Sequence, residues 1–248
     1  MRAVISEREY TRITDLAELF GVSEVTVRSD LDDLAARGQV RRVRGGAVPR
    51  TVSRSEPSFE ESLGAAADEK QRIGQACARL VAAGDTVLLD VGTTTTAVAR
   101  ALVARTDLRD VTVFTNGLTI ALELEPAIPR LAVVVIGGTL RPLQHSLVDP
   151  LGGLALDRIR VGTLFLGCNG VHPTAGVTNV NLPEAELKRR MLQAAQRRVV
   201  VADGTKIGKV TLADLCQVTA VDLIVTGASA DPGTVAALRD RGVQVQVA

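Results

Sequence analysis

Residues 15–31 read DLAELFGVSEVTVRSDL, and this stretch decides the fold of the N-terminal part of the chain. Leu16, Leu19 and Phe20 recur at helical spacing and form one apolar stripe. Gly21 then interrupts the stripe where the chain must turn tightly, because glycine adopts backbone conformations that other residues avoid. The stretch therefore begins with a short helix that ends at a turn.

A second helix is predicted over residues 24–36. Ser23 is a suitable N-cap, and Val27, Leu31 and Leu34 share one face at spacings of four and three. Two short helices joined by a glycine-containing turn are typical of a helix-turn-helix, whose second helix enters the major groove of DNA with its N-terminal part. The residues expected to face the groove are Ser23, Glu24, Thr26, Arg28 and Ser29.

Basic residues follow directly behind these helices. Residues 37–54 contain six arginines and no acid, although the formal net charge of the chain is only +1. Residues 39–48 alternate apolar and basic side chains around a Gly-Gly pair, which predicts a β-hairpin wing along the phosphates. Its expected DNA contacts are Arg41, Arg42 and Arg44. A solvated linker and an ordinary helical hairpin are the alternatives, but neither predicts the turn, the cap and the basic hairpin together.

The rest of the chain has a different pattern. Residues 1–48 form the predicted DNA-binding domain, residues 49–64 are polar and lack periodicity, as in a linker, and residues 65–248 form a second domain. After a helix over residues 65–83, apolar runs alternate with helical patterns, which indicates an α/β domain with a mostly parallel sheet. Its strands are expected near residues 86–90, 111–114, 132–136, 163–166, 198–201, 223–225 and 243–247.

Residues 92–96, GTTTT, follow the first of these strands and lead into a helix. Ligands bind at the carboxyl ends of strands in such sheets. Glycine permits close approach of the backbone, and N–H groups at a helix start donate hydrogen bonds to an anion, so the segment is a candidate phosphate site. Capping alone would need one threonine rather than four. The chain has neither a Walker loop nor a dinucleotide-binding glycine motif.

Three further strand ends have related chemistry. Asn116 offers a donor and an acceptor to sugar hydroxyls, and Gly137 and Gly138 permit close backbone approach. Lys206 lies in a glycine-flanked loop where it could meet a phosphate, with Asp203 orienting it or binding a hydroxyl. Each alone is also explained as a surface turn. The expected effector-binding residues are Gly92, Thr93, Thr94, Thr95, Asn116, Gly137, Gly138, Asp203 and Lys206.

Other conspicuous residues are given structural roles. The three cysteines and two histidines lack the spacing of metal sites or disulfides, so no metal or cofactor is expected. Glu184 and Lys188 lie four apart on a predicted helix, where a stabilising surface ion pair explains them. No apolar run is long enough for a membrane span and no secretory signal is present, so a cytoplasmic location is expected.

These segments resemble the DeoR family of transcriptional regulators. The matching segments are residues 15–23, 26–31 and 41–47, and then 92–95, 115–116, 137–138, 165–170, 184–188 and 203–208. The resemblance implies a winged helix-turn-helix that binds double-stranded operator DNA, and an α/β sensor domain similar in fold to ribose-5-phosphate isomerase and the CoA transferases. It also implies a phosphorylated sugar or related metabolite as effector, and we expect a homodimer or homotetramer. The residues to which it gives effector contacts are Thr93, Thr94, Thr95, Asn116 and Lys206.

The chain departs from the family pattern at a few positions. Ser29 replaces a second arginine, Arg44 replaces a frequent histidine in the wing, and Asp149 replaces a glycine. Gly162 replaces an aspartate, which removes a carboxylate that related isomerases place near the sugar. About a dozen residues precede the motif, so we expect its supporting first helix to be cut short at Met1.

The predicted function is that of a regulator rather than an enzyme, a repressor of a sugar catabolic operon controlled by a phosphorylated metabolite. The main alternative is a sugar-phosphate isomerase or CoA-transferase-like enzyme with an N-terminal extension, for which Glu184, Glu186 and Asp203 are the candidate acid–base groups. A metabolite-binding protein without DNA binding is a third hypothesis.

Overall fold

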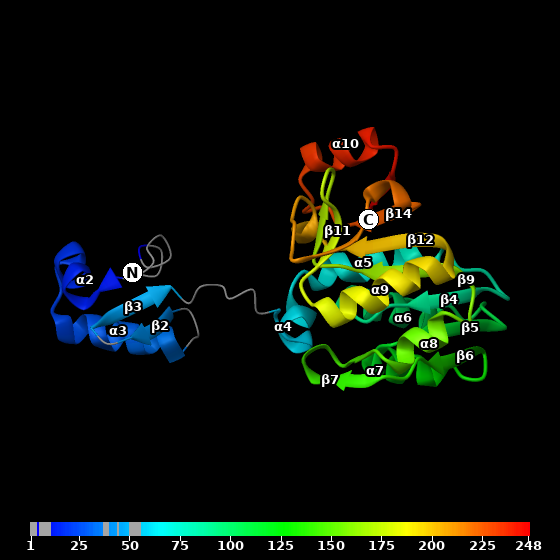
Figure 1. Cartoon of the computed structure of the whole chain (residues 1–248), viewed down its shortest axis with the longest axis horizontal. Coiled ribbons are helices and arrows are strands. Elements are labelled where there is room, and N and C mark those ends of the chain that lie inside the picture. Colours follow the sequence, from blue (N-terminus) through cyan, green and yellow to red (C-terminus); the bar gives the residue numbers. More distant parts are fainter. Residues whose placement is uncertain (1–3, 5–10, 37–39, 44, 50–55) are drawn as a thin grey trace. The chain divides into compact units, whose positions relative to one another are not determined.

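The computed structural model describes residues 4, 11–36, 40–43, 45–49 and 56–248 of the 248-residue chain (Figure 1). The chain forms two compact units, Met1–Ser55 and Glu56–Ala248. No helix within the described ranges is long and apolar enough to cross a membrane. Of the expected shortened first helix, the structure describes Val4, which is helical and packs on the core of the first unit; Arg44 lies outside the described residues.

The first unit contains the predicted helix-turn-helix and hairpin. Its elements are β1 (Thr11–Arg12), α2 (Ile13–Phe20), α3 (Glu24–Ala36), β2 (Val40–Val43) and β3 (Gly46–Pro49). Gly21 has φ 65°, a left-handed conformation that ends α2, and the Ser23 hydroxyl accepts a hydrogen bond from the Thr26 N–H at 3.1 Å. The strands form an antiparallel sheet in the order β1-β3-β2, so the predicted hairpin is confirmed.

The apolar stripe predicted for α2 is wrong in part. Leu16 is buried, but Leu19 and Phe20 are 56% and 41% exposed. The buried positions of this eight-residue helix are Ile13 and Leu16, because its last turn extends past the core formed with α3 and the hairpin. The stripe on α3 is confirmed, since Val27 and Leu31 are fully buried.

The second unit is built on a seven-stranded sheet in which all neighbours are parallel. Its strands, in spatial order, are β15 (Gln244–Val247), β14 (Leu223–Thr226), β12 (Ala195–Ala202), β9 (Val161–Gly167), β4 (Thr86–Leu89), β5 (Val111–Thr115) and β6 (Leu131–Val135). Each predicted strand is present within a few residues. The predicted mostly parallel α/β fold is therefore confirmed.

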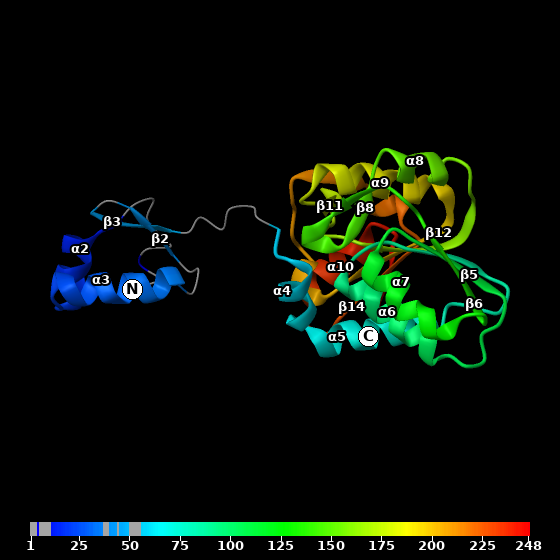
Figure 2. The same ribbon diagram turned by 90° about the horizontal axis from the view of Figure 1, so that it is seen from below.

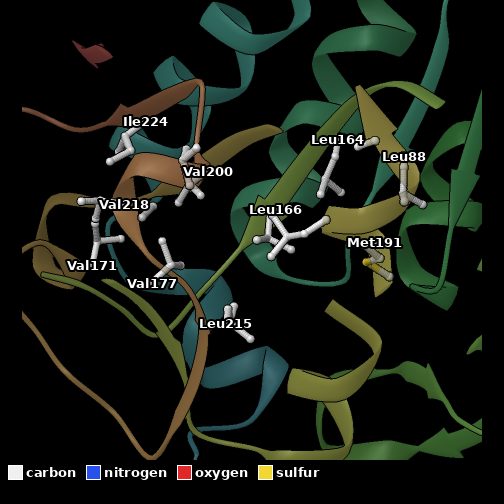
Figure 3. Packing of buried hydrophobic residues seen from close by; sticks show 14 of the residues in the cluster. Leu88, Leu164, Leu166, Val171, Val177, Met191, Val200, Leu215, Val218 and Ile224 are labelled. Carbon is white, nitrogen blue, oxygen red and sulfur yellow. The ribbon is translucent and has the colours of Figure 1, made fainter. Parts of the chain in front are cut away.

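Helices cover both faces of this sheet (Figure 2). One face packs on α5 (Ala67–Ala78), α6 (Thr93–Ala104) and α7 (Leu118–Leu124). The other packs on α8 (Leu151–Leu156), α9 (Leu182–Ala194) and α10 (Pro232–Asp240), with a core that includes Leu88, Leu164 and Met191 (Figure 3). Where both faces are covered, as along β4, β9 and β14, the strands are continuous apolar or buried runs, whereas the edge strand β15 alternates Gln and Val.

Two small sheets lie outside the main one. The hairpin of β7 (Thr139–Arg141) and β8 (Ser146–Val148) follows β6. An antiparallel sheet joins β10 (Gly170–His172), β11 (Gly176–Asn179) and β13 (Ala213–Cys216).

The start of the second unit differs from the sequence prediction. Within the predicted linker 49–64, residues 59–64 form helix α4 (Phe59–Gly64), and α5 is shorter than the predicted helix 65–83. Ser58 and Glu61 form a capping box, in which each side chain bonds the backbone N–H of the other. This helix has less than two turns and is too short to show apolar periodicity, so the sequence pattern did not predict it. Its capping box specifies where it begins.

Candidate functional site

The N-terminal part of α3 presents polar side chains to solvent. Ser23, Glu24, Thr26, Arg28 and Ser29 are all exposed, as expected for residues that face a groove. Arg28 and Glu24 form an exposed ion pair of 3.0 Å, one helical turn apart. Such pairs contribute only about 0.3–0.5 kcal/mol, so the guanidinium can leave its partner at little cost when a base or phosphate is offered.

Of the three wing arginines, Arg42 has a role that the sequence did not reveal. Its guanidinium contacts the Asp32 carboxylate at 2.7 Å and the Arg28 carbonyl at 3.0 Å. Arg42 thus joins the hairpin to α3 rather than pointing freely toward solvent. The structure describes the backbone of Arg41 in β2, and Arg44 lies outside the described residues.

In the second unit, the predicted effector residues gather at one edge of the sheet. The chain runs outward from β4 to β5 and β6 and then returns to β9 on the other side of β4, so β4 is the switch point in strand order. Crevices at such points bind ligands in parallel sheets. Residues 92–95 follow β4, Asn116 follows β5, Gly137 and Gly138 follow β6, and residues 203–206 follow β12.

The threonine segment forms the start of α6. Gly92 has φ 145° and precedes the helix, and the hydroxyls of Thr95 and Thr96 donate to its carbonyl at 2.9 and 2.7 Å. Thr93 is half-buried and Thr94 is buried. Because the first N–H groups of a helix have no intrahelical acceptor, the backbone here supplies anion-binding donors, whereas the Thr95 hydroxyl is already engaged.

The Asn116 side chain holds the chain before this segment in place through two hydrogen bonds to the backbone. Its Oδ1 accepts from the Val91 N–H at 2.9 Å and its Nδ2 donates to the Leu147 carbonyl at 3.2 Å. The side chain is 1% exposed. Asn116 therefore holds the loop after β4 to strand β8, a positioning role that the sequence did not indicate.

The two predicted glycines differ from one another. A Cβ on Gly138 would lie 2.1 Å from the Val148 carbonyl oxygen, whereas one on Gly137 would meet nothing within 4 Å. Gly138 is thus required for close packing against β8, and Gly137 is the one with open space beside it.

The loop after β12 is held by two carboxylates. Asp203 accepts from the Thr205 N–H at 3.1 Å, and Glu69 of α5 accepts from the Gly204 N–H at 3.1 Å and the Ser229 N–H at 2.6 Å. Burial acts to raise the pKa of Glu69, but these bonds outweigh it and the net pKa is lowered. The loop is therefore fixed by α5.

Lys206 ends this loop with a half-buried side chain, and its ammonium makes no hydrogen bond to any residue that the structure describes. Burial lowers the pKa of Lys70. The positive charge of Lys206 also acts to lower this pKa, whereas the negative charge of Asp203 acts to raise it. Burial raises the pKa of Cys168 to about 12, while Lys188 and Lys206 act to lower it and Asp90 acts to raise it. Lys206 follows β12, the neighbour of β9, and the adjacent Ile207 bridges to Val171 of β10.

A buried ion pair at this edge was missed by the sequence prediction. Lys188 of α9 contacts the Asp90 carboxylate directly after β4, and both side chains are buried. Asp90 Oδ2 also accepts from the Gly167 N–H at 3.0 Å, whereas its Oδ1 is buried with no partner among the described residues. Burial raises the pKa of Asp90 to about 6 in spite of Lys188.

The ion pair predicted between Glu184 and Lys188 on a helix face is not the direct contact that forms, because both side chains point into the protein, where Glu184 pairs with Arg141 and Lys188 with Asp90. Glu184 is 4% exposed and accepts from Arg141 at 2.8 Å and from the Ser146 hydroxyl at 2.7 Å. Burial acts to lower the pKa of Lys188, but Asp90 and Glu184 outweigh it. A signal was present, since Glu184 and Lys188 share the helical spacing of the buried Met191 and Leu192.

A hollow of about 510 Å³ lies between α5 and α6. Of the predicted effector residues it includes only Thr93, and Lys70 also lines it. It is therefore not the strand-end site that the sequence predicted.

Known proteins resemble this chain over almost its full length. A putative aga operon transcriptional repressor of Escherichia coli O157:H7 is 33% identical, with 94% of this chain and 86% of that protein covered. The glycerol-3-phosphate regulon repressor of E. coli K12 is 26% identical, with 98% and 95% covered. The ribose-5-phosphate isomerase A of Methanocaldococcus jannaschii gives a TM-score of 0.43 at 19% identity over 58% of this chain and 56% of its own.

Two family models account for the two units. The DeoR-like helix-turn-helix domain matches residues 1–51, and the DeoR C-terminal sensor domain matches residues 65–228. The segments matched include the helix-turn-helix, the hairpin wing and the strand-end loops described above. The chain therefore belongs to the DeoR family of transcriptional regulators.

Proposed function

We propose that this chain represses a sugar catabolic operon and that a phosphorylated sugar or a similar metabolite, bound at the strand-end site of the second unit, changes its affinity for the operator. The observation that carries the proposal is that a helix start with N–H donors follows β4 and the Lys206 loop follows β12, both at the carboxyl ends of strands in one parallel sheet. The names of the two similar repressors support repression of an operon, and that of the glycerol-3-phosphate regulon repressor supports a phosphorylated metabolite as effector.

Operator binding is assigned to the exposed start of α3 and to the wing. Arg28 has the reach for two hydrogen bonds to a guanine or for a phosphate contact. Arg28→Ala is expected to weaken binding to a DNA fragment from upstream of its own gene by about 1–3 kcal/mol. Fluorescence anisotropy at fixed salt measures this loss. Arg158→Ala, which removes an exposed arginine from the second unit, is the matched control, and equal affinities for the two variants would contradict the assignment.

Effector binding is assigned to the N–H groups of residues 93–95 and to Lys206, with Asp203 fixing the lysine loop. Thr93 and Thr94 can add hydroxyl contacts, and Gly92 and Gly137 leave space for backbone approach. Gly138 and Asn116 contribute by holding the β8 strand and the loop after β4 in place. The site thus offers a preorganised set of donors to a dianion.

Lys206→Ala is expected to reduce affinity for a phosphorylated effector by about tenfold or more, because a charge-assisted hydrogen bond contributes roughly 1.5–3 kcal/mol. Thermal shift measurements with hexose phosphates, pentose phosphates and glycerol 3-phosphate, each against its dephosphorylated parent, identify the ligand, since a bound ligand raises apparent stability. Lys209→Ala, an exposed lysine three residues later, is the matched control. A ligand that stabilises Lys206→Ala as strongly as the wild type would overturn the assignment.

A further inference from the structure

The β7–β8 hairpin connects the proposed effector site to the first residues of the second unit. On one side, the Leu147 N–H donates to the Asn116 carbonyl at 2.8 Å, and the Ser146 hydroxyl donates to Glu184. On the other side, Arg141 contacts Glu56, the first residue of this unit. The hairpin therefore touches both the strand-end loops and the chain that arrives from the DNA-binding unit.

Several contacts fasten the residues after Glu56 to the turn of this hairpin. Gln144 Nε2 donates to the Pro57 carbonyl at 2.6 Å. His145 Nε2 lies 3.2 Å from the Glu60 carboxylate, and the His145 and Phe59 rings are 5.2 Å apart. Residues 56–60, which we call the entry segment, are thus docked on the hairpin.

Arg141 is shared by two buried carboxylates. One guanidinium nitrogen contacts Glu56, and the other contacts Glu184 at 2.8 Å. The Arg141 side chain is only 18% exposed, and those of Glu56 and Glu184 are 8% and 4% exposed. Both terminal nitrogens of this guanidinium are thus engaged by carboxylates, so an incoming anion must compete with one of them.

Two carboxylates, those of Glu56 and Glu184, already face Arg141, so the addition of a further anion beside them is electrostatically unfavourable. Glu184 faces Arg141 and also acts on Asp90 and Lys188, so acids at positions 56, 90 and 184 share two cations, Arg141 and Lys188. Burial, aided by Glu184, raises the pKa of Glu56 in spite of Arg141. The cluster already has an excess of negative charge, so an incoming phosphate must displace a carboxylate. Glu56 lies on the entry segment, whereas Asp90 directly follows the central strand β4 and Glu184 lies on α9.

We propose that Arg141 binds the anionic group of the effector and that this group and the Glu56 carboxylate are alternative partners of the guanidinium. Effector binding then releases the entry segment, which continues directly into residues 50–55 and the DNA-binding unit. This inference rests on the proposed function, because it names the residue through which that site acts on the linker. The exchange of partners at Arg141 gives the effector-bound and effector-free states different contacts, as coupling between the effector site and the operator-binding site requires.

Glu56→Gln tests this exchange in the full chain with inorganic phosphate as the probe. The amide keeps the shape of the side chain and removes its charge, so we expect phosphate to bind about tenfold more tightly, because occupancy of Arg141 by Glu56 reduces the apparent affinity of the wild type. Glu125→Gln removes the same charge from an exposed position and is the matched control. Calorimetric titration at matched ionic strength with chloride gives both constants.

Hydrogen–deuterium exchange provides the second readout. Saturating phosphate is expected to speed exchange in the entry segment of the wild type, and Glu56→Gln to speed it without phosphate. Unchanged phosphate affinity in Glu56→Gln, or unchanged exchange in the bound wild type, would overturn the proposal.

The two proposals can fail separately. Loss of phosphate binding in Lys206→Ala together with unchanged affinity in Glu56→Gln would leave the strand-end phosphate site standing and exclude the exchange at Arg141. Tighter binding in Glu56→Gln that persists when Lys206→Ala is added would support the exchange at Arg141 and contradict the role of Lys206.

Discussion

Lys188→Ala is expected to lower the free energy of unfolding by about 3–5 kcal/mol, because it leaves buried carboxylates without their cation. Asp90 is fully buried and loses its ion-pair partner among the described residues, and the nearby Glu184 loses a neighbouring positive charge. Removing both members of the pair costs less than removing one, so Asp90→Asn added to Lys188→Ala should recover part of the loss.

Urea unfolding followed by circular dichroism measures these effects. Lys209→Ala makes the same substitution at an exposed site and should change stability by less than about 0.5 kcal/mol. A Lys188→Ala protein as stable as this control would show that the ion pair contributes nothing to the fold. If the double variant is no more stable than Lys188→Ala, the lost free energy of unfolding does not come from the unpaired Asp90 carboxylate.

Gly138→Ala is expected to destabilise the second unit by about 3 kcal/mol or more. The added Cβ would lie 2.1 Å from the Val148 carbonyl oxygen, and the residue has φ 156°. Backbone atoms cannot rotate away as a flexible side chain can, so either β8 or the loop after β6 must shift. The neighbouring Gly137→Ala is the control, because its Cβ meets nothing within 4 Å.

Thermal unfolding of the two glycine variants separates packing from ligand contact. Gly137→Ala should unfold close to the wild-type temperature, and any change that it causes in phosphosugar binding reports on the site itself. If Gly138→Ala unfolds at the same temperature as Gly137→Ala, the close approach of Gly138 to β8 is not a constraint on the fold.

The sequence predicted the architecture well because the strongest local signals agreed with the tertiary structure. Buried parallel strands are short solid apolar runs, and all seven were predicted close to their bounds. Gly21 and Ser23 located the turn and the start of α3, since each residue has a local physical reason to be there. The short helix α4 was missed because it has a cap but no room for periodicity.

The candidate site was predicted only in outline. The predicted residues do follow strands at one end of the same sheet, but side-chain partners come from distant segments. Asp90 and Lys188 meet only because β4 and α9 are adjacent in space, and Glu56 meets Arg141 across the hairpin. Asn116 was expected to meet sugar hydroxyls, yet both of its polar atoms bond the backbone. The spacing of residues along the chain does not reveal which distant side chains will meet.

The order of strands in the large sheet also bears on how the chain folds. β4 pairs on one side with β5, which follows soon after, but on the other side with β9, whose Thr163 lies opposite Val87. The most distant strand pairing within residues 11–49 joins Thr11 to Ala47, a much shorter separation than that between Val87 and Thr163. Contacts between distant segments slow folding because a long loop must close first. During synthesis, the DNA-binding unit can therefore fold before the second half of the sheet in the second unit has been made.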